Sequence, residues 1–268
     1  MNIQSRKTLE KKFSNVNLNP TYRKTLIFAH RGASGYAPEN TMEAFELAAK
    51  MGADGIELDV HFTADGKVVV LHDEKIDRTS NGQGLVTDYT LAELKGMDFG
   101  YHFHLEKRTG VKIPTLDEVY ELVAPLGMNV NVEIKSADPD IVKACDMIAE
   151  RHRMRENIIY SSFNHFQIQK AKEVIPNAFI APLYSFNMLN PWNYCLDIGA
   201  KASHPKHTQL RLLPDYVRNC HDRGIRVHTW TVNTEEDTSF LLDMGVDAII
   251  TNYPDLGIQI RKQKSKWD

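Results

Sequence analysis

Short apolar segments alternate with amphipathic helical stretches along almost the whole sequence, and this alternation limits the folds open to the chain. The helical stretches mostly begin on Thr, Asp or Asn and end on Gly, as helices do. About eight strand–helix units predict an α/β fold with a parallel sheet, namely a TIM (β/α)8-type barrel. The predicted strands are residues 26–32, 55–62, 67–73, 128–135, 157–163, 178–185, 200–205, 225–232 and 247–252.

A doubly wound open sheet is the alternative architecture, and a chain of 268 residues would also accommodate two smaller domains. The glycine pattern GxGxxG that cradles a dinucleotide is absent from the sequence, which counts against the dinucleotide-binding version of the open sheet. The barrel is therefore the favoured fold.

The second and third predicted strands are separated only by residues 63–67, which contain an Asp-Gly pair. Such a pair is typical of a two-residue hairpin turn. A turn of that kind places Asp59 opposite His72, so that both side chains point into the barrel. A slip of one residue would turn His72 to the other face.

Residues 74–113 are rich in polar side chains and Gly, and they separate the third strand from the next helix. We expect them to form an insertion that caps the C-terminal mouth of the barrel, since long barrel insertions are often lids. The expected organisation is a basic N-terminal arm (1–24), a single barrel domain (25–260) and a basic tail (261–268).

The formal net charge of −3 gives no electrostatic reason to expect a nucleic-acid partner. No apolar run is long enough to span a bilayer, and the basic N-terminus lacks the apolar core of a secretory signal. The three cysteines, Cys145, Cys195 and Cys220, have unrelated spacings and suggest neither a disulfide framework nor a CxxC metal pair. A cytoplasmic location is expected, and the sequence does not decide the oligomeric state.

Three carboxylates lie within apolar strands rather than on the surface. Alternation along 55–62 turns Glu57 and Asp59 into the barrel, and the same alternation along 128–135 turns Glu133 inward. Buried carboxylates that converge cannot all stay ionised without a counter-charge. One divalent cation, Mg²⁺ or Ca²⁺, suits an all-oxygen set; a metal-free network of salt bridges is the alternative.

Cations and imidazoles are expected around these carboxylates. Arg31 and Lys135 can clamp a phosphate. His30 and His72 can act as an acid–base pair, one accepting a proton from the attacking hydroxyl and the other giving one to the leaving alkoxide. This combination suits hydrolysis of a phosphodiester, with water or a substrate hydroxyl as the nucleophile.

Three further residues near this set are expected to have supporting, structural or substrate-binding roles. Glu39 is expected to support Arg31 or the metal from outside the first layer of contacts. Asn40 is expected to cap the helix that starts near Thr41. Trp230, at the C-terminal end of a strand, is placed to contact a substrate or to pack inside the barrel.

The motifs HRGASGYAPENT, GADGIELDVHFTADGKVVVLHDEKIDRTSNGQG, VEIK, HTWTVN and GVDAIITNYPD resemble those of the glycerophosphodiester phosphodiesterase family. The resemblance runs from Leu26 to Leu256 in the family's order. It implies a barrel of the phospholipase-C-like type and metal-dependent hydrolysis of glycerophosphodiesters to glycerol 3-phosphate and an alcohol. The positions that match functional residues are His30 and His72 (catalytic), Glu57, Asp59 and Glu133 (metal), Arg31 (phosphate), and Lys135 and Trp230 (substrate).

Two other functions stay open. A lysophospholipase D would use the same metal and histidines, but it would need an apolar channel for an acyl chain. A catalytically silent barrel that binds phosphate esters would have no use for two matched histidines. The apolar residues of the insertion that could line an acyl channel are Met97, Phe99, Tyr101 and Phe103.

Overall fold

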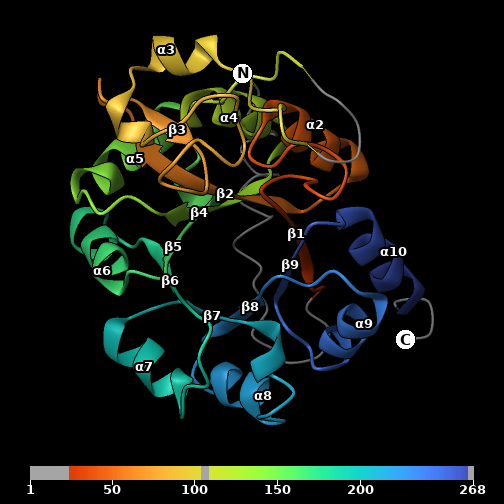
Figure 1. Cartoon of the computed structure of the whole chain (residues 1–268). Coiled ribbons are helices and arrows are strands. Elements are labelled where there is room, and N and C mark those ends of the chain that lie inside the picture. The colour runs from red at the N-terminus through yellow and green to blue at the C-terminus, as the bar shows by residue number, and fades with distance from the viewer. Residues whose placement is uncertain (1–23, 104–108, 265–268) are drawn as a thin grey trace, which may run out of the picture.

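Eight parallel strands close into a barrel in the computed structural model, which describes residues 24–103 and 109–264. The strands follow the order β1-β9-β8-β7-β6-β5-β4-β2, and pairing of β1 with β2 closes the ring (Figure 1). The predicted TIM barrel is confirmed. The strands are β1 (Leu26–His30), β2 (Gly55–Phe62), β4 (Asn129–Ile134), β5 (Ile158–Ser162), β6 (Phe179–Tyr184), β7 (Ala202–Pro205), β8 (Arg226–Thr229) and β9 (Ala248–Thr251).

Helices surround the barrel and cover its outer face (Figure 1). They connect successive parallel strands, as the predicted alternation requires. Short 3-10 turns accompany them at η2 (Ala124–Leu126), η3 (Arg155–Asn157) and η4 (His207–Gln209). The helices are α2 (Met42–Met51), α4 (Leu116–Val123), α5 (Asp140–Arg151), α6 (His165–Val174), α7 (Pro191–Ile198), α8 (Tyr216–His221), α9 (Glu235–Asp243) and α10 (Pro254–Lys264).

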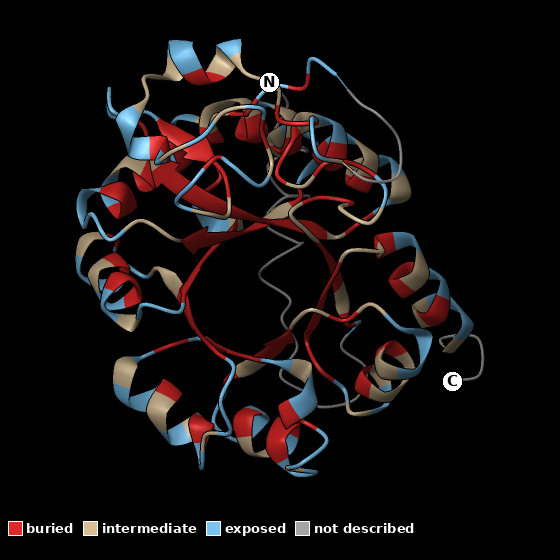
Figure 2. Ribbon diagram, viewed as in Figure 1, coloured by how far each residue is buried: buried red, intermediate tan, exposed pale blue. Residues whose placement is uncertain are grey.

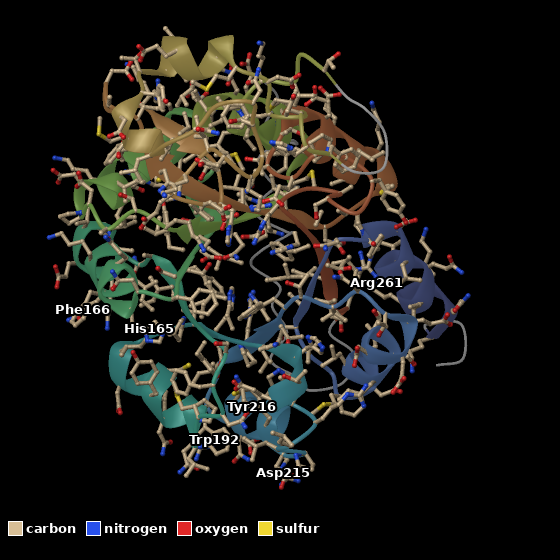
Figure 3. All side chains as sticks on the ribbon, viewed as in Figure 1. His165, Phe166, Trp192, Asp215, Tyr216 and Arg261 are labelled. Atoms are coloured by element: carbon tan, nitrogen blue, oxygen red, sulfur yellow. The ribbon has the colours of Figure 1, made fainter. Side chains whose placement is uncertain are left out.

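The main hydrophobic core lies between the strands and the helices. Each helix turns a buried stripe towards the barrel and an exposed face outward (Figure 2). Ile56, Leu58 and Val60 are fully buried in this layer, so the alternate residues of β2 face the barrel interior as predicted. The layer extends to the aromatic rings of Trp192 and Tyr216, which meet edge to face between α7 and α8 (Figure 3).

The hairpin register predicted from the Asp-Gly pair is wrong by one residue. β3 (Val68–Val70) runs antiparallel to β2 with Val60 opposite Val70, and Leu71 therefore donates its N–H to the Asp59 carbonyl at 3.0 Å. The loop holds three residues instead of two, because Thr63 exchanges backbone and side-chain hydrogen bonds with Lys67. β3 ends at Val70, so the orientation of His72 is set by the irregular chain that follows and not by strand alternation.

The insertion, residues 74–113, packs against the β2–β3 hairpin. It contains η1 (Val86–Asp88) and α3 (Leu91–Gly96) and has a hydrophobic cluster of its own. Lys95 of α3 forms an ion pair with Glu118 of α4 at 2.7 Å, which ties the insertion to the barrel wall. Capping of the mouth by this segment stays a prediction. The cluster consists of Val69, Leu71, Ile76, Val86, Leu94, Phe99, Val111 and Ile113.

Of the expected basic tail (261–268), the structure describes residues 261–264. Residues 261–264 continue α10, and Arg261 points back to the barrel (Figure 3). Its guanidinium donates to the Thr25 carbonyl at 2.7 Å and forms an ion pair with Asp54, so its charge is matched inside the fold. The expected N-terminal arm lies outside the described residues, apart from Lys24. None of the helices in the described part of the chain is long and apolar enough to cross a membrane.

Candidate active site

Three carboxylates from two neighbouring strands converge inside the barrel. Asp59 of β2 lies directly opposite Glu133 of β4 in the sheet register, and Glu57 precedes Asp59 on the same face. One ligand oxygen from each lies within 4.8 Å of the other two. All three residues are buried, with exposed fractions of 3% (Glu57), 0% (Asp59) and 8% (Glu133). The set predicted from strand alternation is therefore brought together.

Two cations lie against this cluster. Arg31 Nε is 3.4 Å from Asp59 Oδ2, and Lys135 Nζ is 2.8 Å from Glu133 Oε1 and 3.9 Å from Asp59 Oδ1. Two positive charges thus face three carboxylates. The predicted site residues Arg31 and Lys135 lie where a phosphate next to the cluster would meet both.

The pKa values of the carboxylates show that the cluster has surplus negative charge. Burial and the charges of Asp59 and Glu133 raise the pKa of Glu57 well above its ordinary value. Burial and the charge of Asp59 raise the pKa of Glu133 to about 7. Burial also acts to raise the pKa of Asp59, but the charges of Arg31 and Lys135 outweigh it and lower that pKa. Salt bridges alone therefore leave charge that a divalent cation would neutralise.

A buried oxygen in the cluster also lacks a hydrogen bond. Asp59 Oδ2 accepts a hydrogen bond from the Asn40 amide at 2.9 Å, whereas Asp59 Oδ1 accepts none from the described residues and has only the Lys135 amine 3.9 Å away. A buried, unpaired carboxylate oxygen is costly unless something binds it. This oxygen and its neighbours on Glu57 and Glu133 form the hard oxygen ligand set that Mg²⁺ and Ca²⁺ prefer.

His30, the last residue of β1, is held at one ring nitrogen. Its Nδ1 lies 2.7 Å from Asn252 Oδ1, just beyond the end of β9, and its Nε2 lies 3.9 Å from Glu57 Oε2. Because an amide oxygen only accepts, Nδ1 carries the proton and Nε2 faces the cluster. Burial, reinforced by the charge of Arg31, lowers the pKa of His30 to about 4.

His72 reaches the same cluster although the register that predicted it is wrong. Its Nδ1 lies 2.6 Å from Asp73 Oδ1, and its Nε2 accepts from Lys135 Nζ at 3.1 Å. The carboxylate of Asp73 fixes the tautomer, as the Asn252 amide does for His30. Each histidine therefore has Nδ1 anchored on an oxygen and Nε2 turned to the site.

The turn between β1 and α2 adopts a backbone conformation that is rare for side-chain-bearing residues. Arg31 and Asn40 both have φ of +56°, and the Asn40 N–H donates to the Arg31 carbonyl at 2.9 Å. The expectation that Asn40 caps α2 is wrong: Thr41 is the N-cap and accepts from the Ala44 N–H. The Asn40 side chain is instead used on Asp59.

Glu39 lies beside Arg31 and accepts from Arg31 Nη1 at 2.8 Å. The same carboxylate accepts two hydrogen bonds from Arg78 of the insertion, both at 2.8 Å. These cations outweigh burial and hold the pKa of Glu39 below its ordinary value. Glu39 is therefore an ionised support for Arg31.

Trp230 lies just past the end of β8 and donates its indole N–H to the His204 carbonyl at 2.9 Å. Phe163, just past β5, meets the Trp230 ring edge to face with centroids 5.3 Å apart, and Lys135 Nζ lies 5.8 Å from the Phe163 ring. Phe163 is 47% exposed, so it is a rim residue. An aromatic wall therefore adjoins the cationic side of the site.

Sequence reasoning missed three polar residues of this site. Asn252 anchors His30, Asp73 anchors His72, and Arg78 joins the insertion to Glu39. Asn252 follows a predicted strand directly, so the rule that strand ends carry site residues could have found it. Asp73 adjoins His72 in sequence, but no pattern marks Arg78 in the polar insertion.

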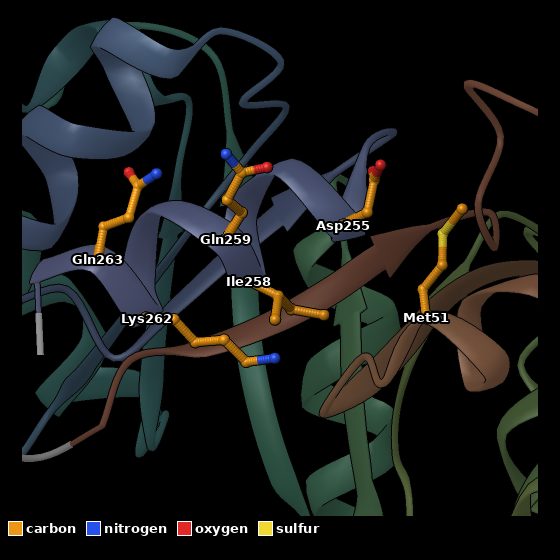
Figure 4. A pocket seen from close by; sticks show the side chains of 6 residues that line it. All are labelled: Met51, Asp255, Ile258, Gln259, Lys262 and Gln263. Atoms are coloured by element: carbon orange, nitrogen blue, oxygen red, sulfur yellow. The ribbon is translucent and has the colours of Figure 1, made fainter. Parts of the chain in front are cut away.

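A cavity of about 190 Å³ adjoins Glu39 between the β1–α2 turn and the insertion. Phe99 and Phe103 line its apolar side, and Arg78 and Ser34 contribute polar atoms. A larger hollow of about 380 Å³ lies on the outer surface between α2 and α10 (Figure 4). Its six lining side chains combine one carboxylate, one amine, two amides and two apolar groups, so it lacks an acid–base or metal-binding set.

Comparison with known proteins agrees with this geometry. Residues 30–256 match the glycerophosphoryl diester phosphodiesterase family. A glycerophosphodiester phosphodiesterase of Caldanaerobacter subterraneus subsp. tengcongensis is 42% identical over 240 residues, which cover 88% of this chain and 98% of the relative. One of Bacillus subtilis is 37% identical over 261 residues, with 88% and 86% covered.

Solved structures share the fold closely. A phosphodiesterase of Oleispira antarctica, in complex with the product sn-glycerol-3-phosphate, has a TM-score of 0.81 and 29% identity, with 88% of this chain and 96% of that chain covered. A glycerophosphodiester phosphodiesterase of Agrobacterium tumefaciens has a TM-score of 0.77 and 30% identity, with 87% and 98% covered.

Proposed function

Since this chain belongs to the glycerophosphoryl diester phosphodiesterase family and is a phosphoric diester hydrolase, we propose that it hydrolyses glycerophosphodiesters to glycerol 3-phosphate and an alcohol with one divalent cation and a histidine acid–base pair. The observation that carries the proposal is a buried triad of carboxylates with two cations against it. His30 Nε2 lies 3.9 Å from Glu57 Oε2, and His72 Nε2 lies 3.1 Å from Lys135 Nζ. These are the groups that phosphodiester hydrolysis requires.

Glu57, Asp59 and Glu133 would hold the cation, Mg²⁺ or Ca²⁺. The fit rests on their surplus negative charge and on Asp59 Oδ1, which is buried and accepts no hydrogen bond from the described residues. When bound, the cation would polarise a phosphoryl oxygen and offset its charge.

Arg31 and Lys135 would bind and orient the phosphate. Arg31 is held by Glu39 and by Asp59, and Lys135 by Glu133, so neither cation has to be ordered when the substrate arrives. Preorganised donors are most effective where charge develops in the transition state. The phosphate oxygens would therefore meet fixed positive charge.

His30 and His72 would move the protons. Nε2 of one histidine accepts the proton of the attacking hydroxyl, which belongs to water or to the 2-hydroxyl of the substrate glycerol. As the bond between phosphorus and the leaving oxygen breaks, Nε2 of the other histidine, which must carry a proton at this step, gives it to that oxygen. Attack by the 2-hydroxyl would leave a cyclic phosphate, which water then hydrolyses to glycerol 3-phosphate. The anchored Nδ1 of each ring keeps Nε2 in position for this exchange.

We further propose that Trp230 and Phe163 contact the carbon face of the glycerol, since they adjoin Lys135 at the rim. The 25–260 region is proposed to act as one barrel domain. The insertion is proposed to cover the mouth, and contact of Arg78 with Glu39 supports this. A cytoplasmic location is proposed from the reduced cysteine set.

Lysophospholipase D activity is a second candidate, and one observation favours it. The cavity beside Glu39 has Phe99 and Phe103 on its walls, two of the residues expected to line an acyl channel. Tyr101 is 56% exposed and does not line this cavity. The space of about 190 Å³ is small for a long acyl chain, so the glycerophosphodiester is the preferred substrate.

A substrate panel crossed with a metal panel tests the proposal. Glycerophosphocholine, glycerophosphoethanolamine and lysophosphatidylcholine would each be incubated with Mg²⁺, Ca²⁺ or EDTA, and both glycerol 3-phosphate and the released choline or ethanolamine would be measured. We expect glycerol 3-phosphate from the first two substrates with metal and none with EDTA. Turnover of lysophosphatidylcholine alone would show the lysophospholipase D, and no turnover of any substrate would favour a silent binding barrel.

A further inference from the structure

We propose that Arg78, which belongs to the insertion, is a positioning residue. It fixes the orientations of the phosphate-binding Arg31 and of His72 relative to each other. The inference rests on the proposed function, because it assigns Arg78 a role in the same site. The side-chain hydrogen bonds of Arg78 within the described residues go to two intervening carboxylates, Glu39 and Asp73, and through them it would act on the site.

The first carboxylate connects Arg78 to Arg31. Arg78 Nη1 and Nη2 donate to the two oxygens of Glu39, both at 2.8 Å, in the two-pronged geometry that guanidinium favours. Glu39 Oε1 also accepts from Arg31 Nη1 at 2.8 Å. The rotamer of Glu39, and with it the direction of the Arg31 guanidinium, is therefore fixed from both sides.

The second carboxylate connects Arg78 to His72. Arg78 Nε donates to Asp73 Oδ2 at 2.6 Å, while Asp73 Oδ1 accepts from His72 Nδ1 at 2.6 Å. The two oxygens of Asp73 are thus divided between the guanidinium and the imidazole. Without Arg78, Asp73 would keep only the imidazole of His72 as a side-chain partner among the described residues, and its orientation would be set less firmly.

One guanidinium therefore spans both halves of the site. Its Nε donates to Asp73, which binds His72, and its Nη1 and Nη2 donate to Glu39, which binds Arg31. Only a guanidinium has donors in this arrangement. A lysine at this place would present a single ammonium, which could satisfy one carboxylate well but not both. The distance between the cation that binds phosphate and the ring that moves a proton is thereby set by a single rigid group.

The Arg78 side chain is a local feature, so its removal should leave the fold intact. It is 48% exposed. The backbone around it is fixed independently: Ile76 is fully buried in the cluster of the insertion, and Ser80 donates to the Ile76 carbonyl through both its N–H and its hydroxyl.

The primary test compares Arg78→Ala with wild-type enzyme, using glycerophosphocholine turnover and the inhibition constant of inorganic phosphate. We expect kcat to fall and the phosphate inhibition constant to rise, each by about 10- to 100-fold, the usual range for groups that orient ligands from behind. Arg78→Lys should recover one of the two parameters better than the other. Added guanidinium ion should partly restore Arg78→Ala, which a general loss of structure would not allow.

Lys95→Met is the matched control. It removes another ion pair between the insertion and the barrel, Lys95 with Glu118, without touching Glu39 or Asp73. Its kcat and phosphate inhibition constant should stay within about twofold of wild type. If it loses as much as Arg78→Ala, the ion pairs merely tether the insertion and the proposal is overturned.

Two further variants separate the two connections. Glu39→Gln should chiefly weaken phosphate inhibition, and Asp73→Asn should chiefly lower kcat. Combining Arg78→Ala with Asp73→Asn should lower kcat by much less than the product of the single effects, since both break one path. Full multiplication of the effects would overturn the proposal.

Failure of the proposed function would be visible separately. If wild-type enzyme turned over no glycerophosphodiester, phosphate binding measured by calorimetry would still report the connection between Arg78 and Arg31. Unchanged phosphate affinity and unchanged kcat in Arg78→Ala would overturn the inference while leaving the phosphodiesterase proposal in place.

Discussion

At the scale of single residues, the two imidazoles differ in the group that accepts the hydrogen bond from Nδ1. Nδ1 of the buried His30 donates to a neutral amide, that of Asn252, whereas Nδ1 of His72 donates to a carboxylate, that of Asp73. A neutral partner does little to stabilise an imidazolium, and a charged partner stabilises it more. The two histidines thus have different environments although both present Nε2 to the same carboxylates.

Replacing either histidine should lower kcat instead of merely weakening binding. We expect His30→Gln and His72→Gln each to reduce kcat by about 10²-fold or more, the usual scale for losing a general acid or base. Steady-state kinetics with glycerophosphocholine would measure this. A variant with near-normal kcat and a raised KM would show that its histidine only binds substrate.

Sequence predicted the residues on strands better than the residues between them. Glu57, Asp59 and Glu133 were identified because strand alternation fixes which face a side chain takes, and they do meet inside the barrel. Asn40 was assigned to helix capping because its position before α2 suits a cap, but Thr41 has that role. Both Asn40 and Thr41 can cap a helix, and the sequence does not show that the Asn40 side chain donates a hydrogen bond to the buried carboxylate of Asp59 instead.

At the scale of elements, the turn between β1 and α2 is the most constrained part of the site. Gly32 has φ of +78°, and a Cβ there would lie 2.6 Å from backbone and side-chain atoms of Ala44 in α2. The turn carries Arg31 and Asn40. A shift of the backbone at Gly32 would therefore displace the proposed phosphate-binding guanidinium of Arg31 and the amide of Asn40 that donates to Asp59.

Gly32→Ala should therefore cost activity out of proportion to stability. The matched control is Gly52→Ala, which has a similar φ of +83° at the end of α2 but open space around the added methyl. Both variants should lose about 1–2 kcal/mol for the left-handed backbone, and Gly32→Ala should lose more because its methyl group clashes with Ala44; urea unfolding would measure both losses. Only Gly32→Ala should also lose kcat/KM by about tenfold or more, as misplaced site groups do; equal activity losses would contradict this account.

The hairpin shows the limit of prediction for elements. All the strands were expected, because their apolar runs and the turns between them are local features. The β2–β3 register was missed by one residue because Thr63 closes a three-residue loop with side-chain hydrogen bonds that the Asp-Gly signal does not encode. His72 nevertheless lies at the site. Because β3 ends at Val70, strand alternation does not determine the direction of the His72 side chain, and the wrong register does not affect it.

At the scale of the whole molecule, the barrel interior is not purely apolar. His204 and His228 lie fully inside it, with His204 Nε2 3.0 Å from His228 Nδ1 and the His228 ring stacked near Phe28 and Phe179. Burial lowers the pKa of His228 to about 4 and that of His204 well below its ordinary value. For His228, the charge of Arg226 adds to this effect, while that of Asp247 opposes it.

This pair should make the fold less stable in mild acid. Between pH 6.5 and about 4 the unfolded chain binds protons on these histidines and the folded chain does not. Their contribution is thus complete above pH 6.5 and is lost as pH falls, by up to about 1.4 kcal/mol per pH unit for each histidine. Urea unfolding of wild type and His228→Phe at pH 7 and pH 5 would measure it. An identical pH dependence in both proteins would contradict the assignment.

The architecture itself was predictable because it depends on the whole chain. One misjudged turn does not change eight alternating units, and a closed barrel needs every strand to be covered by a helix. Features held by single long-range contacts were not predictable: Arg261 joins the C-terminal helix to Asp54, and Arg78 joins the insertion to Glu39. Such contacts depend on tertiary placement that no local pattern specifies.

The most direct test of the account is the activity of thoroughly metal-stripped enzyme with glycerophosphocholine, followed by titration with Mg²⁺ or Ca²⁺. The carboxylate triad has surplus negative charge and a buried oxygen that accepts no hydrogen bond from the described residues, so it should require a cation. We expect negligible turnover in the stripped enzyme, recovery that saturates with added metal, and no recovery in Asp59→Ala. Full turnover in the stripped enzyme would contradict the central claim.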